Sequence, residues 1–159
     1  MSENPHFRSV DSWQSAEALI TFRPRTPRRT AGCDLQSLSV FVMDHKKREL
    51  PVGARSLEAH YGSFTLSQCR KGAGEARRWA LSMRYGSDAR PATIAGREGR
   101  MYELGPEVPS DDIDGRSPAV VTWYDGEMFY LVASTELPAT ELLDIAGSLY
   151  ADELPRPPQ

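Results

Sequence analysis

Hydrophobic and polar residues alternate in several short segments of the chain, and this alternation predicts strands. The first three such segments are 35–42 (LQSLSVFV), 54–61 (ARSLEAHY) and 63–69 (SFTLSQC). Their connections are too short for the crossover that parallel strands require, so an antiparallel meander is predicted. The charged stretch 44–49 is expected to form a solvent-exposed tip between the first two strands.

Glycine-containing dipeptides and short glycine-rich stretches predict two hairpins in the second half. Residues 92–95 and 100–104 flank Gly96-Arg97-Glu98-Gly99, in which glycine can adopt the positive φ of a tight turn. Residues 119–124 and 128–134 enclose Asp125-Gly126, a dipeptide favoured in two-residue turns. Between the hairpins, prolines, glycines and acidic residues predict a loop over 105–118.

Helical spacing of apolar residues appears in three places. Residues 11–19 begin with the capping residue Asp11 and continue with helix formers, which predicts a short helix. A middle helix is predicted over 75–85, and a C-terminal helix over 137–150 whose apolar stripe is Leu142, Ile145, Ala146 and Leu149. Two prolines in 20–30 favour a short strand followed by a polyproline-like connection.

These elements predict an α+β domain: a twisted antiparallel sheet with the middle helix and the C-terminal helix packed on one face. A length of 159 residues is typical of one domain. We place it at residues 11–151, between a loose N-terminus (1–10) and a loose C-terminal tail (152–159).

Charge is unevenly distributed along the chain. Residues 23–100 hold 16 Lys and Arg against 7 Asp and Glu, whereas residues 101–159 hold 2 against 12. The net charges are therefore +9 and −10. Complementarity within one molecule, or head to tail between copies, is the expected use of this division.

The densest positive cluster is Arg23-Pro24-Arg25-Thr26-Pro27-Arg28-Arg29, called here the basic segment. With Lys46, Lys47 and Arg48 it could neutralise phosphates, which makes nucleic-acid binding an alternative function. Against this, the pI is about 5.6, and the segment lacks the interleaved aromatic residues on which single strands stack. The candidate binding residues from this segment are Arg23, Arg25, Arg28 and Arg29.

The last part of the chain resembles a known bacterial domain. The residues that carry the resemblance are Val121-Thr122-Trp123-Tyr124-Asp125-Gly126, Tyr130-Leu131-Val132, and the stretch from Glu141 to Leu149. They are similar to an uncharacterised domain often appended to anti-sigma factors and to lipoprotein-sorting or sporulation-linked proteins of the cell envelope. The resemblance implies a hairpin packed on a helix and supplies no catalytic residues. Trp123 and Tyr130 are candidate binding residues, since an apolar surface between sheet and final helix could hold a lipid or peptide; ordinary core packing is the alternative.

Catalytic and metal-binding patterns are weak. His60 could approach Cys69 across the Gly62 turn, which keeps a thiol-dependent enzyme as a remote alternative. Cys33 and Cys69 have neither metal-ligand nor redox-pair spacing, and buried thiols are expected. The acidic stretch 111–115 only partly matches a calcium loop, so a solvated loop is favoured and neither a metal nor a cofactor is predicted.

The first residues have neither the basic start nor the apolar run of a signal peptide, so a cytoplasmic location is expected, with envelope association left open by the resemblance. No segment has the roughly 20 apolar residues of a membrane span. The function predicted is a non-enzymatic binding or protein-interaction module, regulatory or accessory, that acts through a protein partner or self-association.

Overall fold

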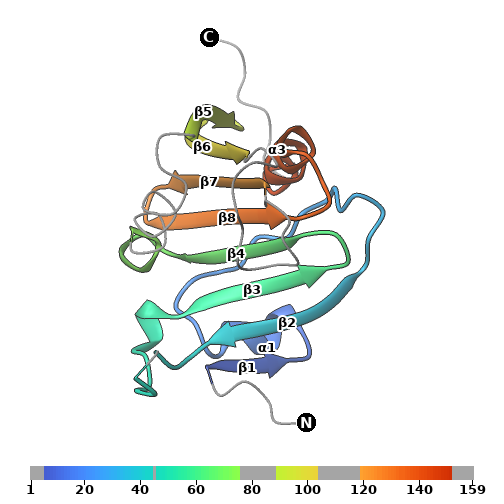
Figure 1. Ribbon diagram of the computed structural model, residues 1–159. Helices are drawn as coiled ribbons and strands as arrows, with labels where there is room; N and C mark the ends of the chain where they lie inside the picture. The colour runs from blue at the N-terminus through green and yellow to red at the C-terminus, as the bar shows by residue number, and fades with distance from the viewer. Residues whose placement is uncertain (1–5, 45, 76–88, 104–118, 152–159) are drawn as a thin grey trace.

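The computed structural model describes residues 6–44, 46–75, 89–103 and 119–151, which form an antiparallel sheet with helices against it (Figure 1). Among these residues the sheet has eight strands in the order β1-β2-β3-β4-β8-β7-β6-β5. The strands are β1 (Phe7–Val10), β2 (Leu35–Phe41), β3 (Ser56–Tyr61), β4 (Thr65–Arg70), β5 (Ala89–Ile94), β6 (Arg97–Glu103), β7 (Ala119–Asp125) and β8 (Met128–Ser134). The α+β class and the antiparallel sheet agree with the sequence prediction.

The predicted meander is confirmed in β2, β3 and β4, which pair as antiparallel neighbours. A bridge between Met43 and Glu49 closes the connection from β2 towards β3, and the short 3₁₀ helix η1 (Val52–Ala54) precedes β3. Arg48 reaches the Asp44 carboxylate at 3.1 Å within this connection. The exposed tip expected over 44–49 therefore begins with an internal ion pair.

Both hairpins form, but their turns differ from the prediction. Between β5 and β6 the turn is Ala95-Gly96, with φ of 49° and 84°, and Gly99 lies inside β6 opposite Trp123. A Cβ on Gly99 would lie 2.6 Å from the carbonyl oxygen of Thr122, so this glycine permits close packing and makes no turn. Between β7 and β8, Asp125 still pairs with Met128, and the turn begins at Gly126.

The N-terminal region is more ordered than predicted. Residues 7–10, placed by the sequence in a loose terminus, form the edge strand β1 beside β2. Helix α1 (Trp13–Glu17) is capped by Ser12, whose hydroxyl accepts from the Ser15 amide. No strand forms in 20–30: the main chain of Arg25 bonds to a side chain instead of a neighbouring strand.

One face of the sheet carries the main core. Side chains of β3, β4, β7 and β8 on this face share an apolar cluster with α1 and with α3 (Ala139–Ser148). Helix α3 contacts β7 and β8, and it lies beside them in Figure 1. The predicted stripe of Leu142, Ile145, Ala146 and Leu149 is buried.

The opposite face carries a smaller cluster of Cys69, Tyr102, Val120, Phe129 and Leu131. Residues 71–75 are helical, and Ala73 packs against this cluster. A Cβ on Gly74 would lie 2.3 Å from the Phe129 Cβ, which shows how closely this turn approaches the sheet.

Some sequence predictions fall outside the described residues. These are the helix over 75–85 apart from Glu75, the loop 105–118 and the tail 152–159. The helical residues 71–75, just before the predicted middle helix, lie on the face opposite α3. Because the rest of the predicted middle helix is outside the described residues, its packing on the same face as α3 stays a prediction. Among the described residues, no helix has the length and apolarity needed to span a membrane.

Candidate functional site

The basic segment crosses the sheet face that carries α3, and a buried glutamine fixes its position. Gln68 of β4 is fully buried. Its Oε1 accepts from the Arg25 amide at 2.8 Å, and its Nε2 donates to the Arg25 carbonyl at 2.7 Å. This pair of bonds imitates the exchange between two strands. Because a buried amide needs hydrogen-bond partners, Gln68 holds the main chain at Arg25 specifically.

The Arg25 side chain enters a cluster of charged and aromatic groups. Its guanidinium lies 4.4 Å from the centre of the Tyr150 ring, and that of Arg97 lies 3.8 Å from the same centre. Asp125 is 3.1 Å from Arg97 Nε and 3.8 Å from Arg25 Nη2. The phenol of Tyr150 donates to the same carboxylate at 3.0 Å. Two cations thus share one anion and one aromatic ring.

Buried aromatic residues support this cluster from the sheet. The Trp123 indole donates to the Tyr150 oxygen at 2.8 Å and stacks on Tyr130 at a centroid distance of 5.2 Å. Burial raises the pKa of the Tyr150 phenol, against the lowering effect of the Trp123 hydrogen bond. Burial also raises the pKa of Tyr130, and the nearby Arg25 charge opposes that rise. Both phenols therefore stay protonated at neutral pH.

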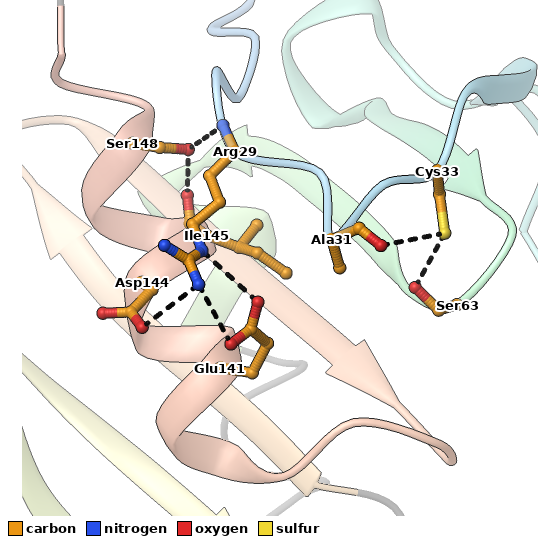
Figure 2. A network of polar contacts seen from close by, with 8 residues as sticks. All are labelled: Arg29, Ala31, Cys33, Ser63, Glu141, Asp144, Ile145 and Ser148. Atoms are coloured by element: carbon orange, nitrogen blue, oxygen red, sulfur yellow. Dashed lines mark hydrogen bonds and ion pairs between the residues drawn. The ribbon is translucent and has the colours of Figure 1, made fainter.

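Arg29, four residues along the segment, binds α3 (Figure 2). Its amide donates to Ser148 Oγ at 3.0 Å. Its guanidinium forks onto the two carboxylate oxygens of Glu141 at 3.3 and 3.4 Å, and lies 4.0 Å from Asp144. The hydrogen bond to Glu141, followed by the charges of both carboxylates, raises the pKa of Arg29.

We call these partners together the basic-segment site: Gln68, Asp125, Glu141, Asp144, Ser148 and Tyr150. It is built by β4, by β7 and by α3, from Glu141 in the first turn of the helix to Tyr150 just beyond its end. Each ion pair in it joins the positive part of the chain (23–100) to the negative part (101–159). The charge division along the sequence is therefore used within one molecule, which is one of the two uses predicted for it.

The predicted binding residues are only partly brought together. Arg25, Trp123 and Tyr130 meet in the aromatic cluster, Arg29 lies on α3, and Arg23 and Arg28 are exposed. The connection that carries Lys46, Lys47 and Arg48 lies at the other end of the sheet, far from α3 (Figure 1). The two basic clusters therefore do not form one surface.

Sequence reasoning missed Gln68, Arg97 and Tyr150, and it read Asp125 only as a turn residue. A signal for Gln68 was present. Phe64 and Leu66 alternate onto the core face, and Gln68 is the next residue in that register. A polar side chain in an apolar register indicates a buried hydrogen-bonding role.

A hollow of about 460 Å³ adjoins the cluster. Arg97, Trp123 and Asp125 line it together with the exposed Arg100 and the half-buried Tyr124. Side chains that contact the basic segment therefore also line a hollow beside the turn between β7 and β8.

His60 and Cys69 do not meet. His60 pairs with Thr65 across the β3–β4 ladder, and Cys69 lies four residues further along β4, roughly 13 Å away at the usual strand rise. The His60 imidazole instead lies 3.2 Å from the Thr65 hydroxyl.

Both cysteines are free thiols. Cys69 is buried as expected, whereas Cys33 is only partly buried and lies 3.1 Å from Ser63 Oγ (Figure 2). In the described part of the chain, no three potential metal ligands of the His, Cys, Asp or Glu type cluster together. The acidic stretch 111–115 lies outside it.

Comparison of the chain with protein-family models, with curated proteins and with solved structures found no match.

Proposed function

We propose that this protein is a non-enzymatic protein-interaction module with an accessory or regulatory role. One observation carries the proposal: a face formed by sheet and helix holds an extended piece of polypeptide. It does so through main-chain hydrogen bonds at Arg25 and Arg29 and through carboxylates around both guanidinium groups. Main-chain bonds combined with a few side-chain sites are how binding modules recognise peptides.

The test is capture with matched variants, followed by rebinding of the purified partner. The full chain captures proteins from a nuclease-treated host lysate, and each captured protein is purified and titrated against wild type, Glu141→Lys and Glu136→Lys. Glu136 is exposed and lies just before α3, where its amide donates to Ser134 Oγ at 3.0 Å. We expect Glu141→Lys to weaken binding at least about tenfold, because it replaces an attracting carboxylate by an ammonium that repels the partner's cation, and Glu136→Lys to leave it unchanged. If no purified protein rebinds, or if both variants behave alike, the proposal is wrong.

Nucleic-acid binding is the second candidate, because Arg23 and Arg28 project from the basic segment with exposed side chains. It is less supported, since Arg25 and Arg29 already have carboxylate partners. Retention of fluorescent DNA or RNA at low salt, lost in Arg23→Glu/Arg28→Glu and falling steeply as salt rises, would favour it over a protein partner.

The resemblance of residues 121–149 to the envelope-associated bacterial domain is part of the same proposal. A domain that is attached to regulators and sorting proteins fits an accessory role. Purified partners that belong to the cell envelope would support this assignment, and exclusively ribosomal or chromosomal partners would contradict it.

A further inference from the structure

We infer that the basic-segment site accepts an Arg-x-Pro-x-Arg segment of a partner protein in trans, and that residues 25–29 of this chain are its internal competitor. The inference rests on the proposed function and names the chemistry that the site recognises. It follows from how each residue of the basic segment is held.

The first arginine is recognised twice. The two bonds from Gln68 to the main chain of Arg25 require an extended residue at this position. Its guanidinium then reaches the Asp125 carboxylate and the face of Tyr150. A lysine would lack the planar group that lies on the ring while facing the carboxylate.

The central proline and the second arginine set the spacing. Pro27 is buried, whereas Thr26 and Arg28 on either side are exposed, so burial specifies the residue at the proline position and not at its two neighbours. Proline fixes φ in the extended range and removes a donor that would otherwise need a partner. At about 3.1 Å per residue, four residues place the next guanidinium roughly 12 Å away, where Glu141 and Asp144 receive it.

At its Arg29 end the internal segment is held by exposed contacts, which permit exchange to begin there. The side chain of Arg29 is 56% exposed and that of Asp144 is 59% exposed, and exposed ion pairs contribute little to stability. The chain then turns through Ala31 and Gly32, with φ of 53° and 75°, and the Cys33 amide bonds to the Thr30 carbonyl. A left-handed conformation is unfavourable for alanine, so release of the basic segment also relieves local strain.

The test adds a synthetic peptide of residues 22–31 (FRPRTPRRTA) to the full-length chain. The variant Arg25→Ala/Arg29→Ala weakens the internal segment and leaves every residue of the site in place. We expect this variant to bind the peptide at least about tenfold more tightly than wild type, because the tethered competitor has a high effective concentration. A peptide of the same composition in scrambled order should bind at least about tenfold more weakly. Circular dichroism and thermal unfolding establish that the variant is folded.

A charge exchange keeps the test valid should that variant not fold. Glu141 is at the surface end of the site, and Glu141→Arg should reject the native peptide and prefer one in which Glu replaces the second arginine. Equal binding of native and scrambled peptides, or no reversal of preference in Glu141→Arg, would overturn the inference. Light scattering tests whether a second copy of the chain is the partner. Dimers of the wild type that are absent in Arg25→Ala/Arg29→Ala would show that a second copy supplies the segment, and would overturn the inference of a different partner protein.

Failure here is distinguishable from failure of the proposed function. Captured proteins that rebind and depend on Glu141, but lack an Arg-x-Pro-x-Arg segment, would remove only the sequence specificity inferred here.

Discussion

The indole nitrogen of Trp123 donates to the phenol oxygen of Tyr150 at 2.8 Å, and the same phenol donates to Asp125 at 3.0 Å. One hydroxyl therefore joins the buried middle of the sheet to the charged groups at its surface. At the end of α3, the Leu149 carbonyl also accepts from Arg25 Nη1 at 3.4 Å.

Tyr150→Phe should lower the free energy of unfolding by about 1–3 kcal/mol, because it leaves the buried Trp123 donor without an acceptor. Tyr61→Phe is the matched control, because Tyr61 is also a buried tyrosine and its ring stacks on Phe64 at 4.6 Å. Urea unfolding followed by tryptophan fluorescence measures both. Equal losses in the two variants would contradict a special role for the Tyr150 hydroxyl.

Two glycines should respond oppositely to alanine. Gly99→Ala places a Cβ 2.5 Å from Ile94 Cδ1 and 2.6 Å from the Thr122 carbonyl oxygen, so we expect a loss of about 1–3 kcal/mol from overpacking. Gly147→Ala, within α3, meets no atom within 4 Å and should gain about 0.5–1 kcal/mol from helix propensity. Thermal unfolding of the two variants checks the signs, and a stabilised Gly99→Ala would show that the β6–β7 pairing is looser than described.

Gln68→Leu should release the basic segment while keeping the core filled. The substitution preserves volume but removes both bonds to the Arg25 main chain. Hydrogen exchange at the Arg25 amide should accelerate at least about tenfold, equivalent to about 1.4 kcal/mol of local opening. Gln36→Leu, at an exposed position of β2, is the control and should not change that rate. Unchanged exchange in Gln68→Leu would mean that other contacts hold the segment.

Stability should fall at alkaline pH. Burial raises the pKa of Tyr61 to about 12, from about 10 in an unfolded chain. The folded state therefore favours the protonated phenol, and the stability this supplies is complete below pH 10 and lost as the pH rises through 12. Raised pKa values of Tyr130 and Tyr150 act in the same direction. Urea unfolding at pH 8 and pH 11.5 should show a loss for Tyr61 alone of up to about 2 kcal/mol, and Tyr61→Phe should lose less than wild type.

Local patterns were enough to predict the strands, because alternation and turn residues act over a few positions. The meander of β2 to β4, the β7–β8 hairpin and the buried stripe of α3 all follow from such patterns. The turn at Ala95-Gly96 was misplaced because Gly96 and Gly99 look alike in sequence, and only the neighbour Trp123 distinguishes a turn glycine from a packed one.

The site itself could not be assembled from the sequence. Its partners are separated by long stretches of chain: Arg25 and Gln68 by 43 residues, and Arg29 and Glu141 by 112. The division of charge indicated that basic and acidic parts would pair, but the pairing of individual residues depends on strand order, which no local signal specifies. The edge strand β1 was missed for the same reason. Its four residues are a strand because they pair with β2, which lies far along the chain.

The sheet consists of two sets of four sequentially adjacent strands that meet only where β4 pairs with β8. Each set pairs only strands that follow one another in the chain, whereas the seam joins residues 65–70 to residues 128–133. Closing so long a loop is slow, so we expect the two halves to acquire structure first and the seam to form last. The basic segment bridges that seam from Gln68 to α3. It therefore belongs to the final step of folding, and its release is the first opening expected when the folded chain comes apart.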